Sequence, residues 1–173
     1  NRPFKEKTQK KCLKAEGQIR NCGANYVLGL FGTSLPTKEF YLFFLTWLLE
    51  DTCLGLLVKA KGDHGLDIQS DGLDGLVQKA LKTGRIQIID ETTAPPYVAA
   101  VVDFSIGIGT YSAIISSASA IKDARVLFVD FEMIGPCKQA TLLDSLGARR
   151  CIFHNFNSVK IAILEYINNP ECN

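Results

Sequence analysis

The sequence predicts an α/β protein. Over residues 85–173 we expect a Rossmann-like, mostly parallel sheet flanked by helices, and over residues 1–84 a less regular, mainly helical region. The prediction depends on short β-favouring runs in the second half that alternate with segments of helical pattern. Strands alternating with helices form βαβ units, whose strands are parallel. The length of 173 residues suits one domain, so we expect the two regions to pack together.

The second half divides into elements by its apolar runs and its breakers. The run YVAAVVDF at 97–104 is continuously β-favouring, which is typical of a strand covered on both faces. The preceding ETTAPP (91–96) predicts a loop, because consecutive prolines cannot donate backbone hydrogen bonds. We expect strands at 85–90, 97–104, 125–131 and 150–156 and helices at 73–81, 110–120 and 138–146. A last helix, capped by Asn157 or Ser158, should place Ile161, Ile163, Leu164 and Ile167 toward the core.

The first half contains a basic arm and an apolar segment. Residues 1–20 hold seven basic and two acidic residues, 7 − 2 = +5, whereas the whole chain carries +1. Such an arm can contact phosphates or anionic lipid, but we expect a solvated tail, and the overall charge gives no strong signal for nucleic-acid binding. The segment FYLFFLTWLL (40–49) is too short to span a bilayer, which needs about 20 residues. It predicts a buried helix, an interfacial segment or a surface for a protein partner.

The sequence gives no metal site. The six cysteines include no C-x-x-C pair and no histidine at zinc-ligand spacing, so we expect reduced thiols and no zinc. The acids of segment 62–75 fail the spacing of an EF-hand, which favours a polar loop. Because the sequence starts at Asn1 rather than Met, we also expect a processed form or a fragment.

The strongest functional candidate is the segment VVDFSIGIG (101–109). If a strand ends near Asp103, the small residues Ser105, Gly107 and Gly109 form a loop that leads into a helix. Such a loop lets a ligand approach the backbone, and the helix N-terminus favours negative charge. In open α/β sheets the ligand site lies beyond the carboxyl ends of the strands. The alternative is a turn between strand and helix that binds nothing.

Two cofactor classes fit this loop. A dinucleotide site needs G-x-G-x-x-G, and here Ser112 occupies the third glycine position. An S-adenosylmethionine site has two apolar residues, an acid and alternating glycines, with Ser105 here in place of the first glycine. An acid before the loop gives nothing to an anionic phosphate but suits a cationic sulfonium and ammonium. Asp103 therefore favours S-adenosylmethionine, and Asp130 or Glu132, after the next strand, could hold the ribose hydroxyls.

The stretch DFSIGIGTYSA (103–113) resembles the cofactor loop of a plant group of S-adenosylmethionine-dependent methyltransferase-like proteins. The similarity extends over about residues 73–156, through LDGLVQKALKTGRIQI, VLFVDFEMIGP and ATLLDSLGARRCIF. It implies a Rossmann-like fold and methyl transfer, with the cofactor held by Asp103, Ser105, Gly107, Gly109, and Asp130 or Glu132. Members of that group often carry an N-terminal membrane anchor, and this sequence shows none, so the resemblance leaves a cytoplasmic and a membrane-associated or Golgi location open.

The sequence also departs from that group. Residues 91–100 look like an insertion, and the chain after Asp130 has room for only about one more strand, whereas methyltransferase sheets of this class typically have seven. No catalytic residue is assigned. Asn155 could line the adenine side, although a surface role is favoured, and His154 is not expected to act as a base. Two alternatives stay open: a non-catalytic α/β interaction domain related to methyltransferases, and a dinucleotide-dependent oxidoreductase.

Overall fold

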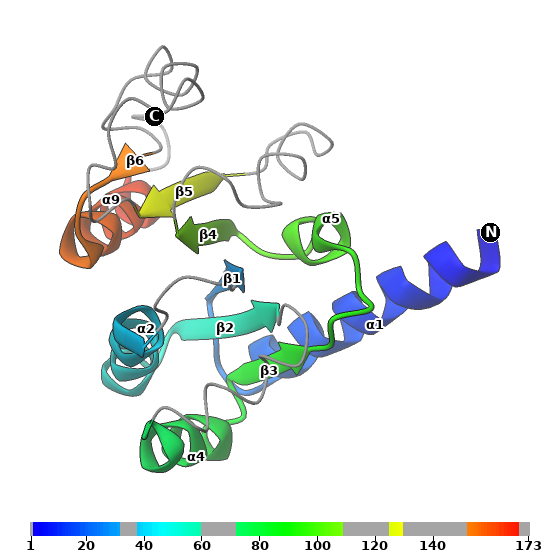
Figure 1. Ribbon diagram of the computed structural model, residues 1–173, viewed down its shortest axis with the longest axis horizontal. Helices are drawn as coiled ribbons and strands as arrows, with labels where there is room; N and C mark the ends of the chain where they lie inside the picture. The colour runs from blue at the N-terminus through cyan, green and yellow to red at the C-terminus, as the bar shows by residue number, and fades with distance from the viewer. Residues whose placement is uncertain (1, 32–37, 60–71, 109–124, 130–151, 170–173) are drawn as a thin grey trace.

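The computed structural model describes residues 2–31, 38–59, 72–108, 125–129 and 152–169. These residues form an α/β fold around a six-stranded, all-parallel sheet (Figure 1). The strands are β1 (Tyr26–Phe31), β2 (Leu54–Lys59), β3 (Ile86–Ile89), β4 (Phe104–Ile108), β5 (Val126–Val129) and β6 (Ile152–Phe153). The helices are α1 (Arg2–Asn21), α2 (Lys38–Glu50), α4 (Asp74–Lys82), α5 (Pro95–Ala99) and α9 (Phe156–Asn168). The predicted α/β class with a parallel sheet is confirmed.

The strand order is β3-β2-β1-β4-β5-β6, so the chain reverses direction across the sheet between β1 and β4. From β1 the chain runs outward to β3. It then returns through α5 to β4, which pairs with the other side of β1, and continues outward to β6. Gly29 lies opposite Ser105, and Phe31 lies opposite Gly107. The ends of β1 and β4 therefore define the switch point of the sheet.

Helix α1 covers one face of the sheet together with α5. Its buried residues Thr8, Cys12, Ala15 and Ile19 follow a 4-3-4 spacing, which places them on one side of a helix. Opposite them in β2 stands Gly55, where a Cβ atom would collide with Ile19 and Ala24. The absence of a side chain thus permits close packing of α1 on β2. The predicted solvated arm is wrong: residues 2–21 are a helix packed on the sheet.

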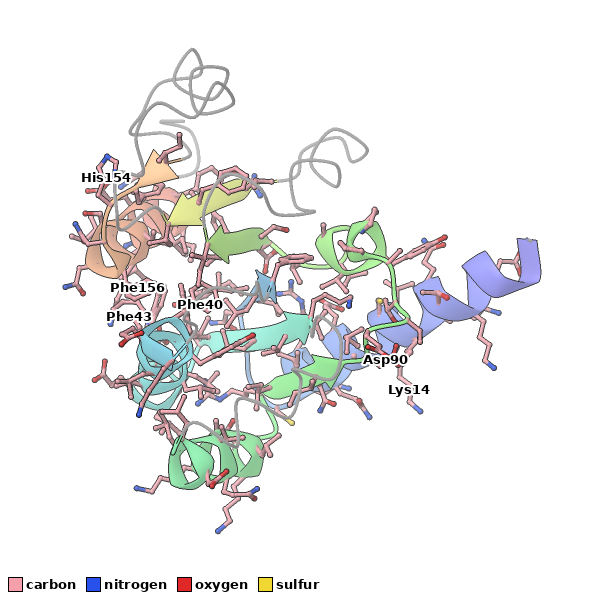
Figure 2. All side chains as sticks on the ribbon, in the orientation of Figure 1. Lys14, Phe40, Phe43, Asp90, His154 and Phe156 are labelled. Carbon is pink, nitrogen blue, oxygen red and sulfur yellow. The ribbon has the colours of Figure 1, made fainter. Side chains whose placement is uncertain are left out.

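The other face is covered by α2, α4 and α9. The predicted buried helix at 40–49 is confirmed within α2, where Phe40, Phe44 and Trp47 are almost fully buried. Phe156, at the start of α9, contacts the rings of Phe40, Phe43 and Phe44 (Figure 2). This aromatic cluster joins α2 to α9. The residues of 40–49 thus serve mainly the core, and a protein partner at this segment stays untested.

Arg85 fixes the carboxyl end of α2. Its guanidinium is buried and donates to three backbone oxygens, those of Leu48 (2.9 Å), Asp51 (2.6 Å) and Leu54 (2.6 Å). The carbonyl of Leu48 lies in the last turn of α2, where carbonyls have no partner within the helix, so the bond from Arg85 satisfies a group that would otherwise be buried without one. Because Arg85 directly precedes β3, this contact also sets the position of β3 relative to α2.

One predicted strand is wrong. Residues 95–99 form the short helix α5, and β4 begins only at Phe104 and contains FSIGI. The consecutive prolines begin α5, where a missing N–H is harmless, because the first turn has no acceptor for it. The whole of FSIGI is buried and paired on both sides, so tertiary pairing rather than local composition decides where this strand lies.

Residues 1–84 supply two strands that were not predicted: β1, in the centre of the sheet, and β2 beside it. Strands appear as predicted at 86–89, 126–129 and 152–153, and helices at 74–82 and 156–168.

Asn155, not Asn157 or Ser158, caps α9: its Oδ1 accepts from the backbone N–H of Ser158 at 2.8 Å. Ile163 is buried as expected, whereas Ile161 and Ile167 are exposed. The predicted helices at 110–120 and 138–146 fall outside the described residues.

Candidate functional site

Asp103 lies at the amino end of β4, not at the carboxyl end of a strand. Its Oδ2 accepts from the backbone N–H of Val27 (2.7 Å) and from Nη2 of Arg20 (2.9 Å). Its own backbone N–H donates to the carbonyl of Val27 at 2.9 Å. These contacts link the start of β4 to β1 and to the last turn of α1. The side chain singled out as a cofactor ligand therefore joins three elements on the amino edge of the sheet.

Arg20 completes this amino-edge contact. Besides Asp103, it binds Glu16 on its own helix and donates from Nη1 to the carbonyl of Asn25 at 2.8 Å. Burial by itself would lower the pKa of Arg20, but the hydrogen bond to Glu16 and the attraction of Asp103 outweigh it, and the pKa is raised. The guanidinium is therefore a permanent cation held between two carboxylates. Asp103 already has this cation as its partner, so it does not need a charged ligand.

The predicted cofactor loop begins inside a strand. Ser105 is 1% exposed, and Gly107 pairs with Phe31 of β1 and Phe128 of β5. At about 3.3 Å per residue, the five steps from Asp103 to Ile108 separate this acid from the carboxyl edge by roughly 16 Å. The prediction that a strand ends near Asp103 and that Ser105 and Gly107 form the loop after it is thus wrong. Gly109, Asp130 and Glu132 lie outside the described residues.

The carboxyl edge of the sheet is the place where an open α/β fold of this order binds ligands. Phe31 and Ile108 end the two strands at the switch point, β1 and β4. Gly107 is the one predicted site residue among those described that lies near this edge, one position before the end of β4. Segments 32–37 and 109–124 follow these two strands directly in sequence and lie outside the described residues.

The structure adds one functional candidate that sequence reasoning missed, Lys59. It ends β2, lies opposite Phe31 in the strand register and is 7% exposed. Its Nζ donates to the backbone carbonyl of Glu91 at 3.3 Å. Burial lowers the pKa of Lys59, while the nearby carboxylate of Glu91 opposes this shift. The only sequence signal was a lysine at the end of the apolar run LGLLVK, directly before a polar, glycine-containing segment.

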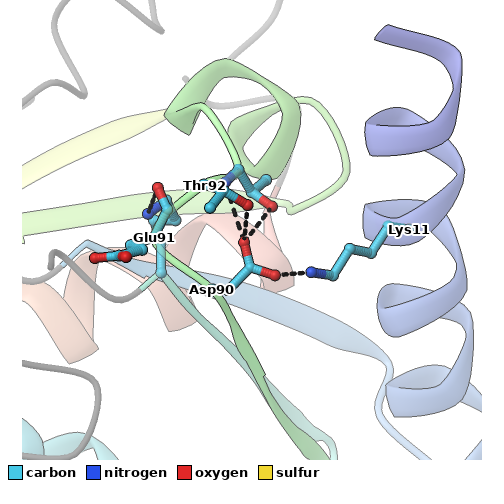
Figure 3. Close-up of polar contacts among 6 residues, drawn as sticks. Lys11, Asp90, Glu91 and Thr92 are labelled. Carbon is cyan, nitrogen blue, oxygen red and sulfur yellow. Dashed lines mark hydrogen bonds and ion pairs between the residues drawn. The ribbon is translucent and has the colours of Figure 1, made fainter. Parts of the chain in front are cut away.

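The turn after β3 is tied to α1 (Figure 3). Asp90 Oδ1 accepts from the hydroxyls of Thr92 (2.6 Å) and Thr93 (3.2 Å) and from the backbone N–H of Thr93 (3.2 Å). Its other oxygen, Oδ2, forms an ion pair with Lys11 of α1. These contacts close the turn and hold it beside the helix, at the same edge as Lys59. Asp90 uses both oxygens for this purpose.

The other polar residues considered in the described ranges do not add a second site. His154 is exposed beside β6, far across the view from Asp90 (Figure 2). Asn155 caps α9 instead of lining a cofactor. Burial raises the pKa of the Cys12 thiol, which favours the protonated form over a nucleophilic thiolate. The described Cys12, Cys22 and Cys53 form no disulfide, and within the described part of the chain no cluster of metal ligands occurs.

In the ranges that the structure describes, no helix has the length and apolar character needed to cross a bilayer. No family model, no curated protein and no solved structure matches this chain. The resemblance of residues 103–113 to methyltransferase-like proteins therefore stays a prediction.

Proposed function

We propose that this chain is a nucleoside-ligand-binding α/β domain, and that its ligand lies beyond the carboxyl ends of β1 and β4. The observation that supports the proposal is the strand order β3-β2-β1-β4-β5-β6, with its reversal between β1 and β4. In open α/β sheets, ligands bind beyond the carboxyl ends of the strands at such a reversal of strand order. Many activities share this fold, so the proposal concerns the binding site rather than one reaction.

Two ligand classes are candidates for this site. S-adenosylmethionine is proposed on the resemblance of residues 103–113, with methyl transfer by in-line displacement at the sulfonium as the activity and positioning as the main catalytic contribution. A phosphate-bearing nucleotide is proposed on the strand order, which is that of dinucleotide-binding sheets. An acid directly before the loop would disfavour a phosphate. Asp103, the acid in question, lies at the amino edge and binds Arg20, so it does not disfavour a phosphate at the carboxyl edge. If neither ligand class binds, the alternative is that the chain is a non-catalytic interaction domain.

Nuclear magnetic resonance can test the binding site without any substitution. Backbone amide shifts are followed while S-adenosylmethionine, S-adenosylhomocysteine, NAD, ADP or UDP is titrated into the ¹⁵N-labelled protein. We expect at least one ligand to shift the amides of Phe31 and Ile108, at the carboxyl ends of β1 and β4. The amides of Tyr26 and Phe104, at the amino ends of the same strands, serve as the control.

The outcome distinguishes the hypotheses directly. Shifts concentrated at the amino ends, or no shift with any of the five ligands, would reject the proposed site. Shifts at the carboxyl ends with the S-adenosyl ligands alone would favour the methyltransferase-like hypothesis. Shifts with ADP, UDP or NAD would favour the phosphate-bearing class.

A further inference from the structure

We propose that the outer face of α1 is a docking surface for an anionic lipid bilayer, to which it binds through a lysine stripe formed by Lys7, Lys10 and Lys14. The proposal concerns a surface of α1 and does not depend on the ligand site proposed at the carboxyl edge. Helix α1 lies at the periphery of the molecule, and its N-terminal turns extend beyond the sheet (Figure 1). The three lysine side chains are exposed, so a large partner can reach them.

The lysine stripe lies along one side of the helix. Its members are three and four residues apart, which places them in one row on an α-helix, over a rise of about 10 Å. The residues that pack on the sheet, such as Cys12 and Ile19, lie on the opposite side of α1. One partner can therefore contact all three ammonium groups while α1 stays packed on the sheet.

The charges of the lysine stripe are not neutralised within the part of the chain that the structure describes. Neighbouring Lys11 forms an ion pair with Asp90, whereas no ion pair or hydrogen bond joins the three lysines of the stripe to another described residue. Glu6, the acid beside the stripe in α1, forms no ion pair with it. Three cations that stabilise nothing inside the fold are thus left to act on a partner.

The distribution of charge over the chain favours a negatively charged surface as this partner. Residues 1–20 carry +5 and the whole chain +1, so the remainder carries 1 − 5 = −4. An anionic surface attracts the basic part and repels the rest, which orients the molecule with α1 toward that surface. Each lysine close to an anionic leaflet strengthens binding roughly fivefold, so three lysines together suffice for a measurable, reversible contact.

The chemistry of the face favours a bilayer over a nucleic acid. All three cations of the lysine stripe are ammonium groups, which lack the planar fork with which arginine binds phosphates in pairs. Between Glu6 and Asn21, α1 contains no aromatic residue that could stack on bases. Leu13, which is 50% exposed, flanks the stripe, and an apolar side chain beside lysines suits the boundary between headgroups and acyl chains. A straight row on an outward-facing helix also fits a flat surface better than a groove.

The experiment measures binding of the full chain to lipid vesicles by cosedimentation, in low and in high salt. The vesicles contain phosphatidylcholine alone, or phosphatidylcholine and phosphatidylserine in a ratio of about 7:3. A short DNA duplex, followed by fluorescence anisotropy, serves as the alternative anionic partner. The test variant combines Lys7→Gln, Lys10→Gln and Lys14→Gln. It should remain folded, because glutamine has nearly the helix propensity of lysine and the changed side chains are exposed, and circular dichroism checks this.

The matched control removes three exposed lysines of α2 and α4, which cover the other face of the sheet, by combining Lys38→Gln, Lys79→Gln and Lys82→Gln. Both triple variants change the net charge from +1 to 1 − 3 = −2, so they differ only in where the charge is lost. A difference between them therefore reports on the lysine stripe rather than on net charge.

We expect the wild type to bind the phosphatidylserine vesicles at least tenfold more tightly than phosphatidylcholine alone, and to lose this preference in high salt. The lysine-stripe variant should lose about 100-fold in affinity for the anionic vesicles, and the control variant should stay within about threefold of the wild type. Equal losses in the two variants overturn the proposal, as does equal binding to both kinds of vesicle. Tighter binding to the DNA duplex than to anionic vesicles, or no binding to vesicles at all, also overturns it.

Discussion

The two edges of the sheet use their polar residues differently. At the amino edge, Asp103 binds Arg20 and the backbone N–H of Val27, and the guanidinium of Arg85 binds three backbone carbonyls. Each of these contacts joins elements that are distant in sequence. At the carboxyl edge, Asp90 closes a turn and pairs with an exposed lysine, and Lys59 brings a buried charge close to the switch point. The difference shows that an acid beside a glycine-rich segment can stabilise the fold instead of binding a ligand. We therefore expect amino-edge substitutions to change stability and carboxyl-edge substitutions to change binding.

The largest expected loss of stability comes from Arg85→Met. The substitution leaves the carbonyls of Leu48, Asp51 and Leu54 without their charged donor in a buried place. We expect the free energy of unfolding to fall by about 3 kcal/mol or more. Urea unfolding followed by circular dichroism measures this loss.

Arg125→Met is the matched control for Arg85→Met. Arg125 is exposed and lies 4.1 Å from the ring centroid of Tyr166, so its loss should cost about 1 kcal/mol or less. If the two variants lost the same free energy of unfolding, the burial of Arg85 would contribute nothing to stability. That result would contradict the structural role assigned to the amino edge.

The next expected effect is that of Asp103→Asn. The carboxylate binds the N–H of Val27 and the guanidinium of Arg20, and a neutral amide keeps the shape but loses the charge. We expect a loss of about 1–2 kcal/mol in the free energy of unfolding. Any ligand that the chain binds should keep its affinity. A double-mutant cycle with Arg20→Ala should show coupling, because the two side chains are in direct contact. Loss of ligand affinity with unchanged stability would restore Asp103 as a site residue.

The fold class could be predicted because strand and helix patterns alternate clearly after residue 85. The neighbouring strands β1 and β2 could not, although YVLGLF and the first five residues of LGLLVK are apolar. A strand buried on both faces lacks the alternation that marks a half-exposed strand, and a short apolar run does not distinguish a strand from a buried helix. Only pairing with β4 and β3 settles their position.

The site was misplaced for a related reason. YVAAVVDF and FSIGI are both apolar enough to be buried strands, and local composition cannot choose between them. Their choice depends on the pairing of Phe104–Ile108 between β1 and β5, which involves residues far away in the chain. Moving the strand by a few residues carries Asp103 from one edge of the sheet to the other. Lys59 was not predicted as a site residue, because its notable property is burial, and burial cannot be read from the sequence.

Alkaline pH offers a smaller effect that involves two buried tyrosines, Tyr41 and Tyr26. Burial raises the pKa of Tyr41, in α2, to about 12, and burial followed by the hydrogen bond to Asp51 raises the pKa of Tyr26 at the amino edge. Above pH 10.0, the ordinary value, the unfolded chain loses these protons while the folded chain retains them. Stability is therefore fully present below pH 10 and falls as pH rises toward 12.

Tyr41→Phe tests this pH dependence. Between pH 10 and 11 the wild type should lose about 1 kcal/mol for each buried tyrosine, and the variant should lose correspondingly less. Chemical unfolding at pH 8, 10 and 11 measures the difference. Phe44→Leu, which changes a buried neighbour without a titratable group, should lower stability equally at all three pH values. An identical pH dependence in Tyr41→Phe and the wild type would contradict the assignment.

The smallest expected effect is that of Lys11→Ala at the carboxyl edge. The side chains of Lys11 and Asp90 are 47% and 44% exposed, and ion pairs of this kind contribute about 0.5 kcal/mol or less, which salt reduces further. Lys14→Ala, which removes an exposed lysine three residues later on the same helix, is the matched control. The two variants should differ by only a few tenths of a kcal/mol in low salt and not at all in high salt. If Lys11→Ala lowered the free energy of unfolding as much as Asp103→Asn does, the ion pair between the turn after β3 and α1 would contribute as much stability as the contact between β4 and β1. The division of the sheet into a structural edge and a binding edge would then fail.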